Sequence, residues 1–208
     1  MTTFDSRLYG PGPRRLQDQF DSRRLADRLV EITVTDEIDE RYARFIGEAT
    51  YFYLATVDAE GFPDVSYKGG QPGFVQVPDP KTIRFPSYDG NGMYRSLGNL
   101  SENGRVGLLF IRQDDRPARI RVQGTARIIT DDDIVGGFEG AELVVEIAVG
   151  RLFPNCPRYV HDLGSGELST FAPAPGHVPP EPEWKQWEQF SDVLPGTAAD
   201  GDDPADPS

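Results

Sequence analysis

Apolar residues in the first quarter of the chain recur at helical spacing. Between residues 13 and 31 they alternate with charged positions, which predicts one surface helix with an apolar stripe of Leu16, Phe20, Leu25, Leu29 and Val30. Residues 35–49 predict a second helix, with Thr35 as its N-cap and a stripe of Ile38, Tyr42, Phe45 and Ile46. We therefore expect a helical extension over residues 1–48.

From residue 51 the pattern changes to short β-branched and aromatic runs separated by turn residues. These runs predict three hairpins, formed by residues 51–57 with 62–68, 74–77 with 82–85, and 106–111 with 118–129. Gly124 inside the longest run predicts a bulge, and residues 142–153 predict a further strand. Short helices are expected from Met93 to Leu97 and within residues 130–141. Many evenly spaced strands with few helices between them favour an antiparallel barrel.

The strand at residues 62–68 carries an unusual polar face. Alternation places Asp64, Ser66 and Lys68 on one side and assigns Val65 and Tyr67 to the other, buried side. Glycines follow directly in the sequence. The polar side of this strand resembles the floor of an anion-binding site.

Composition and charge exclude several classes of protein. The 208 residues carry a formal net charge of −13, which argues against binding to nucleic acid or to an anionic membrane. No apolar N-terminal region predicts a secretory signal, and no apolar run is long enough to cross a bilayer. We expect a soluble, cytoplasmic protein. Residues 166–208 are proline-rich and then acidic, and we expect this C-terminal extension to be partly disordered.

Two groups of residues are candidates for anion binding. Gly90, Asn91 and Gly92 precede a predicted helix, whose N-terminal N–H groups and dipole favour an anion. Arg119, Arg121 and Gln123 share one face of their strand, with Ile120 and Val122 on the core face. The alternative for the first group is an ordinary turn with a solvated lysine nearby, and for the second a solvated strand face.

Cys156 is the single cysteine of the chain. A pairing with His161 would suit a nucleophile, although a buried, inert cysteine is the commoner outcome. His161 and His177 are the two histidines, so a histidine-rich zinc site is not expected. The aspartates at residues 131–133 are expected to cap a helix. The chain lacks the P-loop, the Rossmann glycine fingerprint and the hydrolase elbow.

Taken together, several segments resemble the pyridoxamine 5'-phosphate oxidase-like FMN-binding split-barrel proteins, in an uncharacterised bacterial branch with an N-terminal helical extension. These segments are "FYLATVDAEGFPDVSYKGGQPGFV", "IRFPSYDGNGMYRSLGNL", "VGLLFI", "ARIRVQGTARI" and "LFPNCPRY". The resemblance implies a mainly β, antiparallel six-stranded split β-barrel over residues 49–165. It also implies a homodimer that binds two FMN molecules in grooves between its subunits.

The resemblance also assigns the cofactor contacts. The strand that carries Lys68 lies along the flavin in this family, and the glycines after Lys68 let the chain pass close to the cofactor or the partner subunit. The implied FMN-binding residues are Ser66, Tyr67, Lys68, Phe85, Pro86, Ser87, Asn91, Gly92, Met93, Arg119 and Arg158. No catalytic residue and no metal ligand is assigned.

Two departures from the family bear on the activity. The vitamin oxidases have an Arg-Lys pair at the phosphate turn, where this chain has Asn91-Gly92. They also end in a Trp-to-Arg-Leu-Pro terminus, whereas Trp184 and Trp187 are followed here by an acidic tail without arginine. Two function classes stay open: a flavin-dependent oxidoreductase that takes electrons from a nicotinamide or a small-molecule substrate, and a non-catalytic flavin-, deazaflavin- or haem-binding or redox-sensing protein.

Overall fold

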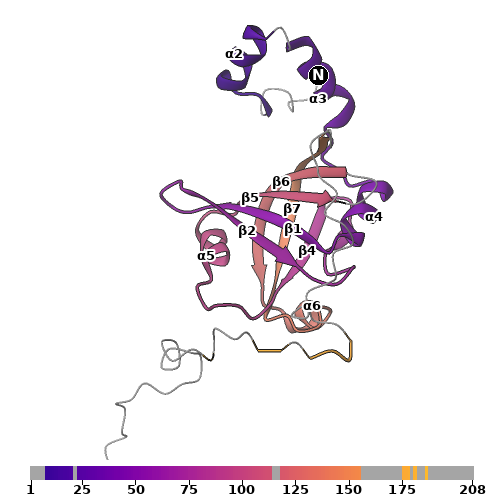
Figure 1. The fold of residues 1–208 in the computed structure, drawn as a ribbon, viewed down its shortest axis with the longest axis vertical. Helices are drawn as coiled ribbons and strands as arrows, with labels where there is room; N and C mark the ends of the chain where they lie inside the picture. Colours follow the sequence, from indigo (N-terminus) through magenta and orange to yellow (C-terminus); the bar gives the residue numbers. More distant parts are fainter. Residues whose placement is uncertain are drawn as a thin grey trace, which may run out of the picture.

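A computed structural model describes residues 8–20, 23–113, 118–155, 175–178, 180–181 and 186. The predictions for Cys156, Arg158, His161 and most of the C-terminal extension fall outside these residues. Seven strands form one sheet in the order β2-β1-β5-β6-β7-β4-β3, and all neighbours pair antiparallel (Figure 1). Their bounds are Tyr51–Val57, Pro63–Gly69, Gln76–Asp79, Thr82–Ser87, Arg105–Arg112, Ala118–Ile129 and Leu143–Asn155 for β1 to β7.

The mainly β, antiparallel prediction is confirmed. The seven strands match the three hairpins and one further strand of the sequence pattern, one more than the six that the family resemblance implies. The short strand β3 pairs with β4 alone at one edge of the sheet. All three predicted hairpins form, as β1 with β2, β3 with β4 and β5 with β6.

The sheet curls around the larger of two apolar clusters. Phe52 on β1 and Phe85 on β4 are separated by three strands in the sheet order, yet their ring centroids are 5.0 Å apart. Phe110 on β5 lies 5.0 Å from the same Phe52 ring. All three side chains are almost completely buried. Contact across the inside of the sheet requires strong curvature, and burial of these aromatic rings is its main stabilisation.

A bulge forms at the predicted position beside Gly124, and its extra residue is Gly150 on β7. The register between β6 and β7 shifts between Gln123 and Gly124. A Cβ atom at position 124 would lie 2.3 Å from the carbonyl oxygen of Ala148 on β7. The two strands therefore approach more closely than any side chain at this position allows.

Gly124→Ala is expected to destabilise the fold by about 1–3 kcal/mol, because a backbone oxygen rather than a flexible side chain would have to move. Thermal unfolding followed by circular dichroism measures this as a drop in Tm of several degrees. Gly47→Ala in helix α4 is the control, since nothing lies within 4 Å of a Cβ there. An unchanged Tm for Gly124→Ala would show that the bulge tolerates a side chain.

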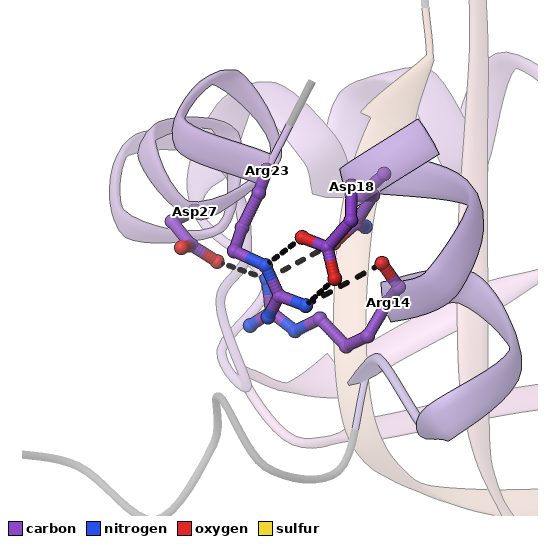
Figure 2. Close-up of polar contacts among 5 residues, drawn as sticks. Arg14, Asp18, Arg23 and Asp27 are labelled. Carbon is purple, nitrogen blue, oxygen red and sulfur yellow. Dashed lines mark hydrogen bonds and ion pairs between the residues drawn. The ribbon is translucent and has the colours of Figure 1, made fainter. Parts of the chain in front are cut away.

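The N-terminal region contains two helices where the pattern predicted one. Helix α2 spans Pro11–Gln19 and α3 spans Arg23–Thr33, and the pair stands apart from the sheet (Figure 1). Arg23 donates to Asp18 Oδ2 at 2.6 Å across the break, and Arg14 pairs with Asp27 (Figure 2). Leu16 and Phe20 are exposed. Without a core beneath them, apolar packing does not hold one continuous helix in place.

The next helix begins later than the sequence suggested. Helix α4 spans Glu40–Glu48, and its N-cap is Asp39, whose Oδ1 accepts the N–H of Tyr42 at 2.8 Å. Thr35 is not a cap, because its backbone pairs with Leu152 of β7 in an isolated bridge. The predicted apolar stripe is confirmed, with Tyr42 and Ile46 in the core. Helix α6, Asp132–Val135, is capped by Asp131 as expected.

Strand β2 presents the opposite faces from those predicted. Val65 is 64% exposed and Tyr67 is 61% exposed, whereas Asp64, Ser66 and Lys68 are half-buried. The register pairs Lys68 with Phe52 and Tyr67 with Tyr53. Paired residues in an antiparallel sheet point to the same side, so Lys68 lies on the inner face with Phe52. The apolar pair lies on the outer face.

Among the described helices, none is long and apolar enough to span a membrane.

Candidate cofactor site

Lys68 is the central charged residue of the candidate site. Burial lowers the pKa of its ammonium, and the nearby carboxylate of Asp64 opposes that shift. Within the described residues Lys68 makes no hydrogen bond and no ion pair at 4.0 Å or less. A half-buried cation without a partner is unfavourable, and it identifies this position as one where a bound anion would stabilise the charged form.

Helix α5 places further polar groups beside Lys68. This helix spans Arg95–Glu102 and lies against β1, β2 and β6. The Ser96 hydroxyl donates to Ser66 Oγ at 2.9 Å, which joins α5 to the inner face of β2. Ser96 is buried, while Ser66 is half-buried. The hydroxyl pair therefore adds a neutral polar group to the Lys68 side of β2.

A second polar pair joins α5 to β1. The amide Nδ2 of Asn99 donates to Thr56 Oγ1 at 2.9 Å, and both residues are buried. Buried polar groups are retained when they are paired, so this bond fixes the helix on β1. Neither Asn99 nor Thr56 was among the residues predicted from the sequence. The available signal was the spacing of Ser96 and Asn99, three residues apart on one face of the helix.

The glycine turn before α5 contains two residues with positive φ. Gly92 has a φ of +74° and Tyr94, the N-cap, has a φ of +46°. Asn91 Oδ1 accepts the N–H of Met93 at 3.1 Å, so the side-chain oxygen is engaged within the turn. Met93 is 71% exposed. The helix starts at Arg95, two residues later than predicted, because Tyr94 leaves the right-handed helical region.

The candidates on β4 differ in what they offer to a ligand. Phe85 is 1% exposed and packs on Phe52, and Pro86 is also buried. Their side chains belong to the core, so only backbone atoms of these two residues remain for a cofactor. Ser87 is half-buried at the end of the strand, and its carbonyl oxygen accepts the N–H of Glu142.

Two candidates lie on the other side of the sheet from Lys68. Tyr67 on β2 pairs with Tyr53, which pairs with Leu109 on β5, and Leu109 pairs with Arg121 on β6. This row is the outer face, and Arg119, two residues from Arg121 on the same strand, shares it. Tyr67 and Arg119 therefore cannot meet in one chain with a ligand held by Lys68. Arg158, the remaining candidate, lies outside the described residues.

The outer face also gathers aromatic side chains. The rings of Tyr51 and Tyr67 stack with centroids 5.4 Å apart, and Tyr53 meets Tyr67 edge to face at 6.0 Å. Burial raises the pKa of both Tyr51 and Tyr67. Exposed Val65 continues this patch along β2, and we refer to Tyr51, Tyr53, Val65 and Tyr67 as the tyrosine face.

Comparison with known proteins bears on the identity of the fold. The family model for pyridoxamine 5'-phosphate oxidase matches residues 38–154, more than half of the chain. No curated protein matches.

Among solved structures, HupZ from Group A Streptococcus is 24% identical, with a TM-score of 0.46 over 61% of this chain and 99% of that one. A candidate pyridoxamine 5'-phosphate oxidase from Lactobacillus delbrueckii is 23% identical, with a TM-score of 0.47 over 59% of this chain and 99% of that one. An FMN-binding protein from Syntrophomonas wolfei is 15% identical, with a TM-score of 0.43 over 68% and 97%.

Proposed function

Because the chain belongs to the pyridoxamine 5'-phosphate oxidase family, we propose that it binds FMN and acts as an oxidoreductase on a small molecule. The observation that carries the proposal is Lys68, a half-buried cation that no described residue pairs. Partial burial of a lysine ammonium without an anionic partner is energetically unfavourable. An anionic ligand on the inner side of β2 supplies the missing partner.

The residues around Lys68 fit a flavin mononucleotide. FMN has one phosphate and a ring system with several hydrogen-bonding groups. Lys68 offers a charged donor, the Ser66 and Ser96 hydroxyls offer neutral ones, and the turn at Asn91 and Gly92 offers backbone N–H groups near the start of α5. These donors come from β2 and from the start of α5, two elements that the chain brings into contact.

Bound FMN supplies the electron and hydride transfer of the proposed reaction. The protein's own residues bind and orient it: Lys68 neutralises negative charge, and the Asn99–Thr56 bond holds α5 against β1. The turn carries Asn91 and Gly92 where the vitamin oxidases carry Arg and Lys. We therefore propose a substrate other than pyridoxamine 5'-phosphate, with a nicotinamide as the candidate electron donor.

The site is proposed to need a second copy of the chain. Tyr67 and Arg119 face away from Lys68 within one subunit. One flavin can therefore contact Lys68 of one subunit and also Tyr67 and Arg119 only if a second subunit provides the latter two from its outer face. The tyrosine face is an exposed aromatic and apolar surface of the kind that marks protein interfaces. A homodimer through this surface accounts for its exposure in the single chain.

Purified protein is expected to be yellow and to release FMN on denaturation. Liquid chromatography with mass detection distinguishes FMN from FAD, riboflavin, a deazaflavin or haem. A preparation that stays colourless after incubation with excess FMN would refute the proposal. Anaerobic mixing with NADH or NADPH then tests for catalysis, since bleaching of the flavin is expected of an oxidoreductase and not of a storage or sensor protein.

A further inference from the structure

A cavity on the outer face of the sheet is lined by none of the candidate flavin-binding residues. It has a volume of about 720 Å³, within the range of small-ligand sites. Strands β5, β6 and β7 supply most of its walls, and Asp36 from the link between α3 and α4 also lines it. The polar side chains that line it include those of Asp36, Arg105, Gln123, Thr125 and Arg151.

Two arginines reach this cavity from strands on either side of β6. Arg105 on β5 pairs in register with Thr125, and Arg151 on β7 pairs with Gln123. Both β6 partners lie beside the bulge at Gly124, so the arginines flank the same short stretch of strand. The lining glycines Gly124 and Gly150 contribute no side chain to fill the space between them.

Neither arginine is paired within the described part of the chain. Two other arginines of the sheet, Arg84 and Arg127, are paired, because both donate to the Glu146 carboxylate, at 2.7 Å in each case through Nε. Asp36 is the acid in the cavity lining, and it already pairs with Lys81 at 2.9 Å. In a chain with a net charge of −13, two unpaired guanidinium groups in one cavity form a local positive site.

We propose that this cavity binds a small organic anion with more than one carboxylate or phosphate group. Each guanidinium presents a planar fork that matches such a group in two parallel hydrogen bonds. The Gln123 amide and the Thr125 hydroxyl supply neutral donors between the two forks. The volume exceeds what a single inorganic ion fills, which favours a multivalent organic ligand. The proposal does not involve Lys68, which lies on the inner face of β2, and the cavity lining does not include Arg119 or Tyr67.

Isothermal titration calorimetry at constant ionic strength tests the proposal with two probes, citrate for carboxylates and pyrophosphate for phosphates. At least one probe is expected to bind the wild-type protein saturably. Arg105→Ala and Arg151→Ala should each weaken that binding about 10- to 100-fold, the loss of a charge-assisted contact. Arg44→Ala removes the same charge from the exposed side of α4 and should change the affinity less than about twofold.

Arg105→Lys and Arg151→Lys keep the charge and the fold but lose the fork, and each is expected to bind about tenfold more weakly. Lys68→Ala should leave the binding of the probe unchanged. The proposal is overturned if neither probe binds the wild type, if Arg44→Ala loses as much as the cavity variants, if the lysine variants bind like wild type, or if Lys68→Ala abolishes binding.

Discussion

Lys68→Ala is expected to weaken FMN binding roughly 10- to 100-fold. A hydrogen bond to a charged group contributes about 1.5–3 kcal/mol, and each 1.4 kcal/mol changes the dissociation constant about tenfold. Lys68 is half-buried and unpaired within the described residues, so solvent screens such a contact less than at an exposed site. Quenching of flavin fluorescence during titration, at matched salt, measures the dissociation constant of each variant.

Lys68→Glu should lose more affinity than Lys68→Ala, because it places a negative charge next to the anionic cofactor. Lys81→Ala is the matched control: Lys81 is a surface lysine whose partner is Asp36, and its removal should change FMN affinity less than about twofold. Lys68→Ala should melt no lower than the wild type, since the ammonium has no partner to lose. Equal affinities for Lys68→Ala and wild type would remove Lys68 from the site.

The pH dependence of FMN binding gives a second readout on the same residue. Burial lowers the pKa of Lys68 in the free protein, and an anion binds the protonated form. Affinity is therefore expected to fall as the pH rises through this lowered pKa, and the fall should be absent in Lys68→Ala. A pH profile that is the same in both proteins would contradict a direct contact between Lys68 and the cofactor.

Replacing Val65 and Tyr67 together by aspartate is expected to convert a dimer into a monomer. Both side chains are more than 60% exposed in the single chain and form the β2 part of the tyrosine face. Two charges without partners in an apolar interface cost several kcal/mol each, which is enough to dissociate a micromolar dimer. Light scattering should show the mass falling from twice 23.1 kDa to the mass of one chain.

Val178→Asp is the matched control for the dimer, because it introduces the same charge at a valine that is 88% exposed and lies outside the sheet. It should remain a dimer. A wild-type protein that is already monomeric at micromolar concentration would refute the interface. If the double aspartate variant is monomeric but binds FMN with wild-type affinity, the proposed dimer interface is supported. The proposal that the flavin site is shared between two subunits is then refuted.

Local sequence patterns predicted much of the fold because they reflect interactions between residues that are close in sequence. Alternation with turn residues identified the three hairpins, and the glycine within β6 predicted the position of the bulge, whose extra residue lies opposite on β7. The aspartates before α6 were recognised as caps, and Ile120 and Val122 were correctly assigned to the core face. Each of these features depends on residues adjacent in sequence, on one strand pair or on one helix terminus, so the chain itself determined them.

Tertiary packing decided the features that depend on distant partners. A period of two separates the faces of a strand but does not say which face is inside. On β2, helix α5 decided which face is inside. The Ser96 hydroxyl of α5 donates a hydrogen bond to Ser66, so the polar face of β2 is the inner one. The start of α4 was decided by Leu152 of β7, which pairs with Thr35 and removes it from capping. The burial of Phe85 was decided by curvature that brings β4 against β1. In each case the deciding contact joins residues far apart in sequence, and no local pattern contains it.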